Sequence, residues 1–195
     1  MSKYYARTFL PWIVLAVGSG VDNRVGAVDG LIAALVLIAA DRRAGRRFDE
    51  LILDLSTTGF MALFALWSVF APDSPALDYG TALAMAWLGA TAWLSLALRR
   101  PFTRGIARRT VSEEIARTTA FERVNVIITL VWALCFTLEA VSLAVVRYRS
   151  PHSVVALVAC KVALVAAAAI FTARYPEYAR RRADAAASTM EEEPA

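Results

Sequence analysis

The apolar segment VNVIITLVWALCFTLEAVSLAVV, residues 124–146, decides the fold class. It is about as long as the ~20 residues that an α-helix needs to cross the hydrocarbon core of a bilayer. Its polar side chains recur at spacings of three or four residues, which places them on one face of a helix. They are Asn125, Thr129, Trp132, Cys135, Glu139 and Ser142.

The one charged residue of that face, Glu139, limits what the face can contact. Glu139 cannot face lipid without a large free-energy cost, so this face should lie against other helices or along a water-filled cavity. Two interpretations stay open. Either the polar residues form a seam that packs the helices together, or they line a path for a solute or a proton.

Long apolar blocks run through the whole chain. Of its 195 residues, 58% are hydrophobic and the mean hydropathy is +0.52, which is typical of membrane helices and not of a soluble domain. We therefore predict an all-α, polytopic bundle of transmembrane helices, a single membrane domain over residues 1–182. Its six predicted spans cover about residues 8–21, 25–40, 51–71, 79–98, 124–146 and 152–172. Residues 183–195, which contain an acidic run, are predicted to be a disordered tail.

The orientation in the membrane follows from the distribution of Arg and Lys. With both termini in the cytoplasm, six spans place 17 of these residues inside and only three outside. We therefore expect a multi-pass protein of the bacterial cytoplasmic (inner) membrane with both termini cytoplasmic.

Several kinds of site have no support in the sequence. The net charge of +4 does not indicate nucleic-acid binding, because the Arg residues lie at helix ends and no such motif occurs. Cys135 and Cys160 lie in apolar spans without a CxxC motif, and the single His, His152, lies at an outer edge. No Ser-His-Asp set, GxGxxG or P-loop motif is present. We expect no metal site, no cofactor, no catalytic residues and no enzymatic activity.

Three further charged residues fall within predicted spans. Asp29 lies one turn inside the second span, where it either pairs with Arg24 at the membrane surface or lines an outer vestibule. Asp54, near the start of the third span, is expected to cap the helix or to pair with the Arg residues just before it. Lys161 lies in the sixth span at nearly the depth of Glu139 in the fifth, so an ion pair between these two is expected.

Rows of small residues at every fourth position mark two helices for close packing. One row lies in the second span (Gly26, Gly30 and Ala34), and the other lies in the fourth (Ala82, Ala86 and Ala90).

A basic loop, residues 99–123, precedes the central apolar segment. Thr110 and Glu113 form a capping-box pattern, which predicts that a short helix begins at Val111. The loop holds seven Arg residues, and each Arg near an anionic leaflet contributes about 1 kcal/mol of attraction. We expect part of this charge to contact anionic lipid or a negatively charged partner; the plainer alternative is that it only sets orientation. The residues concerned are Arg104, Arg108 and Arg109.

Residues at both ends of the loop form a pattern. It comprises Pro11 in the first span, Arg100-Pro101-Phe102 after the fourth, Arg123 and Asn125 at the entry to the fifth, and Trp132. Over about residues 10–146 the chain thereby resembles the intracellular septation protein A family, also called YciB or IspZ, with its uncharacterised actinobacterial relatives. The interval from Asn125 to Trp132 is about one helical turn longer in this chain than in the bacterial septation proteins. The resemblance implies an inner-membrane protein of septation and envelope maintenance, and it brings no catalytic residues.

Function is therefore open between classes of membrane protein. The resemblance favours a role in septation or the cell envelope through contacts with lipids or with envelope and division proteins, as a monomer or an oligomer. The alternative is a small-solute or proton-coupled transporter or channel that uses Asp29, Glu139 and Lys161. A lipid-modifying enzyme has only the basic loop in its favour. A cavity that reaches Glu139 would favour transport, and a dry, packed interior would favour the interaction role.

Overall fold

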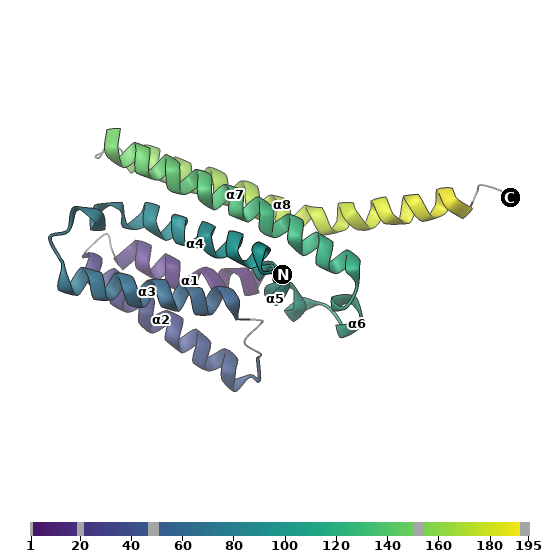
Figure 1. Cartoon of the computed structure of the whole chain (residues 1–195), viewed down its shortest axis with the longest axis horizontal. Coiled ribbons are helices and arrows are strands. Elements are labelled where there is room, and N and C mark those ends of the chain that lie inside the picture. Colours follow the sequence, from purple (N-terminus) through teal and green to yellow (C-terminus); the bar gives the residue numbers. More distant parts are fainter. Residues whose placement is uncertain (1, 19–21, 47–50, 150–153, 192–195) are drawn as a thin grey trace.

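Helix α7 (Thr119–Arg149) is the helix that the apolar segment predicts, and it is 31 residues long. At 1.5 Å per residue its length is about 46 Å, which exceeds the ~30 Å hydrocarbon core of a bilayer. It therefore extends beyond residues 124–146 at both ends. Helix α4 packs along one side of α7, and α8 packs along another (Figure 1).

The computed structural model describes residues 2–18, 22–46, 51–149 and 154–191. Within these ranges all regular secondary structure is helical, which confirms the all-α prediction. The other long helices are α1 (Ser2–Gly18), α2 (Asn23–Arg43), α3 (Ile52–Phe70), α4 (Gly80–Ala97) and α8 (Val154–Glu191). The short ones are η2 (Pro75–Tyr79), α5 (Phe102–Ala107), η3 (Arg108–Thr110) and α6 (Glu113–Ala116).

The long helices pack in chain order. Helix α2 packs against both α1 and α3, and α7 packs against both α4 and α8. Figure 1 shows α1, α2 and α3 below α4, with α7 and α8 above it and α8 reaching beyond the rest of the bundle.

The bundle has two ends that differ in chemistry. The loop end holds the last turn of α2, the start of α3 and the segments α5, η3 and α6, and it includes an ion pair between Arg7 and Asp41. The turn end holds the start of α2, the end of α3 and η2, and there Arg24 donates a hydrogen bond to the carbonyl oxygen of Ser68.

Within the described ranges, three helical stretches are long and apolar enough to cross a membrane: Ile52–Phe70, Pro75–Ala97 and Thr119–Arg149. The apolar part of α1, Arg7–Gly18, is shorter. These lengths and compositions mark the chain as a membrane protein. Six spans with both termini in the cytoplasm remain a prediction.

The tail differs from its prediction. Residues 183–191 continue α8, although disorder was expected from residue 183 onward. Ala has the highest intrinsic helix propensity, and a helix that is already formed extends at little cost. The Ala-rich composition of residues 183–187 therefore accounts for the continued helix.

The predicted start of α6 is also wrong. Val111 is extended, and the N-cap is Ser112, whose hydroxyl accepts a hydrogen bond from the backbone N–H of Ile115. Thr110 instead donates to the carbonyl oxygen of Ala107, inside η3. Its hydroxyl is therefore engaged by the preceding turn.

Only one of the two small-residue rows lies wholly inside the bundle. Gly26, Gly30 and Ala34 are all buried, and a Cβ on Gly30 would lie 3.0 Å from the sulfur of Met61. In α4, by contrast, Ala86 and Ala90 are exposed. The buried side of α4 instead follows Ala82, Ala84, Leu88, Gly89, Ala92 and Ser95.

The end of α4 turns sharply into the loop. Arg99 has a positive φ of 55°, its N–H donates to the carbonyl oxygen of Leu96, and the N–H of Arg100 donates to that of Ser95. This pair of bonds is a Schellman motif, in which Gly is the usual residue at the left-handed position. Pro101, three residues after the C-cap Leu98, prevents α4 from continuing. The 102–110 segment returns and contacts α4 and α7.

Candidate functional site

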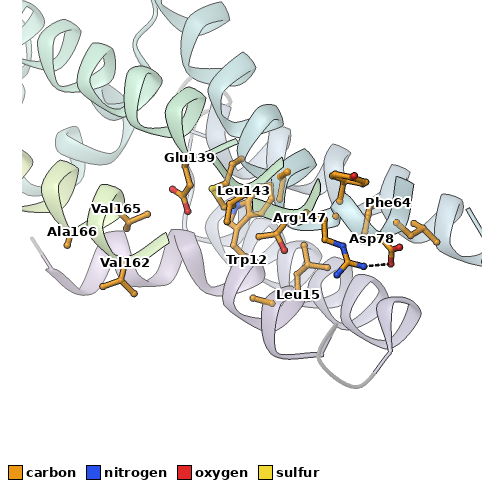
Figure 2. Close-up of a pocket in the computed structure, with 18 of the residues that line it drawn as sticks. Trp12, Leu15, Phe64, Asp78, Glu139, Leu143, Arg147, Val162, Val165 and Ala166 are labelled. Carbon is orange, nitrogen blue, oxygen red and sulfur yellow. Dashed lines mark ion pairs between the residues drawn. The ribbon is translucent and has the colours of Figure 1, made fainter. Parts of the chain in front are cut away.

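A cavity of about 790 Å³ lies among α1, α3, η2, α4, α7 and α8 (Figure 2). Its walls combine aromatic, aliphatic and small side chains with three charged residues, which are Asp78, Glu139 and Arg147. A volume of this size is within the range of pockets that hold small organic molecules. The apolar residues include Trp12, Leu15, Phe64, Met85, Leu143 and Val165.

The cavity runs from the turn end into the interior. At the turn end, a guanidinium nitrogen of Arg147 lies 3.1 Å from a carboxylate oxygen of Asp78, and both side chains are partly exposed. Glu139 lies two helical turns deeper on α7, about 12 Å at 1.5 Å per residue, and is only 1% exposed. Figure 2 shows Leu143 between Glu139 and Arg147, with Val162 and Val165 of α8 on the other wall. The cavity therefore leads from a solvated ion pair to a buried carboxylate.

An aromatic layer lies on the loop-end side of this cavity. Trp12 stacks on Phe60 with ring centroids 5.1 Å apart, and Trp132 lies at the same centroid distance from Phe136. Phe9 of α1 stacks on Trp132 of α7. Trp12 also lines the cavity, whereas Phe60, Trp132 and Phe136 are buried in the core and do not line it. These rings fill the space between the cavity and the loop end.

The polar face of α7 changes role along its length. Near the loop end it is a seam, because Thr103 bonds to the hydroxyl of Thr129 at 2.7 Å and donates to the carbonyl oxygen of Asn125. Farther along, the indole N–H of Trp132 donates to the hydroxyl of Thr172 in α8. Only at Glu139 does the face reach the cavity. The loop-end half of this face is therefore a packing seam, and the other half borders the cavity at Glu139.

A second charged cluster lies buried at the loop end. Arg109 approaches a carboxylate oxygen of Asp41 and one of Asp54, each at 3.5 Å, and its side chain is 1% exposed. Asp41 also pairs with Arg7 at 3.1 Å. Two Arg and two Asp residues from α1, α2, α3 and η3 thus meet in a charge-balanced network. Burial of such charges is tolerated only when they are paired in this way.

The structure places the residues predicted from the basic loop in different surroundings. Arg109 lies inside the network, with no access to lipid headgroups. Arg108 pairs with Glu113 at 2.9 Å, and Arg104 is half-buried. A lipid or partner contact therefore stays a prediction for Arg104 and Arg108 only. Asp54 pairs with Arg109, which lies 55 positions along the chain, and not with an Arg of the 42–46 segment.

The intramembrane charges are not brought together as a set. Asp29 is exposed on α2 and does not line the cavity, and the described residues include no ion pair between it and Arg24. The side chain of Lys161 lies outside the described part of the structure, so its pairing with Glu139 stays a prediction. Among the residues that are described, no group of three His, Cys, Asp or Glu is placed to hold a metal ion.

The residues that carry the family resemblance lie mostly at the loop end. Pro101, Phe102, Asn125 and Trp132 are buried, whereas Arg100 and Arg123 are exposed. The backbone N–H of Phe102 donates a hydrogen bond to the hydroxyl oxygen of Ser95 in α4. The buried members thus hold the 102–110 segment against α4 and α7.

Sequence reasoning missed Asp78, Arg147, Asp41 and Arg7. Each lies at the end of a predicted span, where charged residues are ordinary, and no spacing links them. The available signal was a pair of opposite charges at helix ends on the same side of the predicted membrane, such as Asp78 before the fourth span and Arg147 after the fifth. That signal becomes specific only when the neighbours of each helix are known.

Comparison of the chain with protein-family models, with curated proteins and with solved structures finds no match. The resemblance to the septation proteins therefore stays a prediction, and the argument for function rests on the cavity and its residues.

Proposed function

We propose that this protein is a multi-pass protein of the bacterial cytoplasmic membrane that binds and moves a small solute, or a proton with it, through the cavity. The observation that carries the proposal is the continuous cavity from the Asp78–Arg147 pair to Glu139. A wall of mainly apolar side chains with a few placed charges is typical of small-molecule sites. A carboxylate inside a membrane domain is costly and is commonly a site of ion or proton movement.

The orientation of the site follows from the charge distribution. The positive-inside rule places the loop end, with its many Arg residues, in the cytoplasm and the turn end outside. The cavity then faces the outer side, and both termini are cytoplasmic. A role in septation or envelope maintenance stays an expectation of the resemblance, and the cavity is the feature that favours transport over it.

The direct test is flux in proteoliposomes. Purified protein is reconstituted with a pH-sensitive dye inside, and amines, amino acids, carboxylates and sugars are added outside, with and without a pH gradient. We expect at least one class to enter or to dissipate the gradient. Glu139→Gln should abolish that flux, because the amide keeps the shape and removes the charge.

The matched control is Glu122→Gln, which removes an exposed carboxylate from the same helix. It should leave the flux at the level of the unmodified protein. Filling the cavity by Ala166→Phe should block a solute without removing any charge. Absence of flux for all classes, or full flux in the Glu139→Gln variant, would contradict the proposal.

A further inference from the structure

We propose that the 102–110 segment, formed by α5 and η3, is the inner gate of this cavity and that Arg109 is its latch. The inference rests on the proposed function, since a gate presupposes something to pass. It concerns the loop end, whereas the proposed solute site lies toward the turn end.

The segment closes the loop end of the bundle. Phe102, Thr103 and Ile106 are at most 4% exposed, so one face of this segment is inserted among the long helices. Arg109, at its end, is 1% exposed as a side chain. The segment therefore packs into the same core as the aromatic layer, and the proposal places it on the cytoplasmic side of the route from the cavity.

Beside the apolar packing of Phe102 and Ile106 in the core, the segment makes polar contacts with four different helices. The N–H of Phe102 donates to Ser95 of α4, and Thr103 bonds to Thr129 of α7. Arg109 pairs with Asp41 of α2 and Asp54 of α3. Water can replace these polar contacts when the segment moves, whereas the apolar packing of Phe102 and Ile106 has to be broken.

The segment depends on these contacts for its structure. Helix α5 has six residues and η3 has three, and helices this short are not stable alone in water. Pro101 precedes the segment and an extended Val111 follows it, so it is set off from α4 and α6 at both ends. Loss of the Arg109 pairs should therefore release the whole segment and not a single side chain.

Two reporter cysteines test the gate in a background with Cys135 and Cys160 replaced by Ser. Ile106→Cys reports on the segment, and Met85→Cys, at a partly buried position in the cavity wall, reports on the cavity. Inside-out and right-side-out vesicles are treated with a membrane-impermeant maleimide. In the parent, Ile106→Cys should be protected on the cytoplasmic side, and Met85→Cys should react only from outside.

Arg109→Gln should make both reporters react from the cytoplasmic side, at least tenfold faster than in the parent. The matched control is Arg108→Gln, which removes the same charge one position earlier from a pair with the exposed Glu113 and should change neither rate. Thr103→Val removes the hydrogen bonds to α7 without changing charge, and it should act in the same direction as Arg109→Gln. It serves as the second variant if Arg109→Gln does not insert.

The two reporters separate a gate from a structural clamp. If Ile106→Cys becomes reactive while Met85→Cys stays unreactive from the cytoplasmic side, the segment only supports the fold and the gate is overturned. Unchanged labelling of both reporters in Arg109→Gln and Thr103→Val overturns it too. Failure of the proposed function would appear instead as absent flux in proteoliposomes, with these labelling patterns intact.

Discussion

Charged side chains in this molecule occur in two environments, which set the cost of removing them. The Asp78 side chain is 59% exposed and its partner Arg147 is 32% exposed, so water competes for both. Arg109, Asp41 and Asp54 are at most 9% exposed and have only one another and Arg7 as charged partners in the described contacts. The same substitution should therefore have unequal effects at the two ends.

Arg109→Gln should lower the free energy of unfolding by about 3–5 kcal/mol, because it leaves two buried carboxylates without their cation. Asp78→Asn should lower it by less than about 1 kcal/mol, as for other exposed ion pairs. Denaturant titration of the purified protein in detergent measures both. Equal losses of unfolding free energy in the two variants would mean that burial does not make the Arg109 pairs more stabilising than the exposed Asp78–Arg147 pair.

Glu139 and Lys161 should form an ion pair between α7 and α8. Lone charges near mid-membrane cost about 2.5–3.5 kcal/mol each on insertion scales, so pairing is favourable. Glu139→Gln and Lys161→Met should each lower the unfolding midpoint in detergent, and the double variant should recover part of the loss. Additive losses in this cycle would show that the two residues do not interact.

At the scale of the helices, Trp side chains bond neighbouring elements together. The indole N–H of Trp12 donates to Thr57 of α3, and that of Trp132 donates to Thr172 of α8. Trp87 of α4 donates to Ser56 of α3. An indole has one donor and a large apolar surface, so each of these contacts fixes both the spacing and the register of two helices.

Helices α1 and α2 approach each other closely at a pair of glycines. A Cβ on Gly18 would lie 2.5 Å from the Cα of Gly26, a distance that requires the backbones to move. Gly18→Ala should therefore destabilise the protein by about 1–3 kcal/mol, the usual cost of overpacking.

Gly59→Ala is the matched control in α3. Its Cβ would meet only Trp87, at 3.9 Å, so Ala fits and should stabilise the helix by up to about 1 kcal/mol through its higher propensity. Thermal unfolding in detergent should move in opposite directions for the two variants. A shift in the same direction would contradict the close approach of α1 and α2.

Over the whole molecule, the charged and aromatic residues are arranged in layers along the bundle. The Asp78–Arg147 pair and the cavity lie toward the turn end, the aromatic rings lie below them, and the Arg109 network closes the loop end. Under the proposed transport role, a cavity that is open toward the turn end and closed toward the loop end corresponds to one state of an alternating-access cycle. The two ends should therefore face different compartments.

Single cysteines at Ser74 and Ser112 test this orientation in a Cys-free background. Ser74 lies between α3 and η2 at the turn end, and Ser112 caps α6 at the loop end. The excess of Arg at the loop end predicts that only the cysteine at position 74 reacts with an impermeant thiol reagent in intact cells. Reaction at position 112 with protection at 74 would overturn the six-span topology.

The sequence by itself determined the features that depend on local periodicity. The spacing of Asn125, Thr129, Trp132 and Glu139 places them on one face of α7, and all four are buried. Long apolar runs predicted the helices, because each run must satisfy its backbone hydrogen bonds internally in a membrane. These inferences use only residues close together in the chain.

Only the tertiary structure decided which charges meet. Arg109 pairs with Asp54, 55 positions away, and Arg147 pairs with Asp78. Neither contact follows from spacing, because it depends on which helices are neighbours and on where the loop returns. The same holds for the cavity, which is the space that α1, α4, α7 and α8 leave unfilled around Glu139. Packing between distant segments sets such features, and a periodic pattern within one helix carries no information about it.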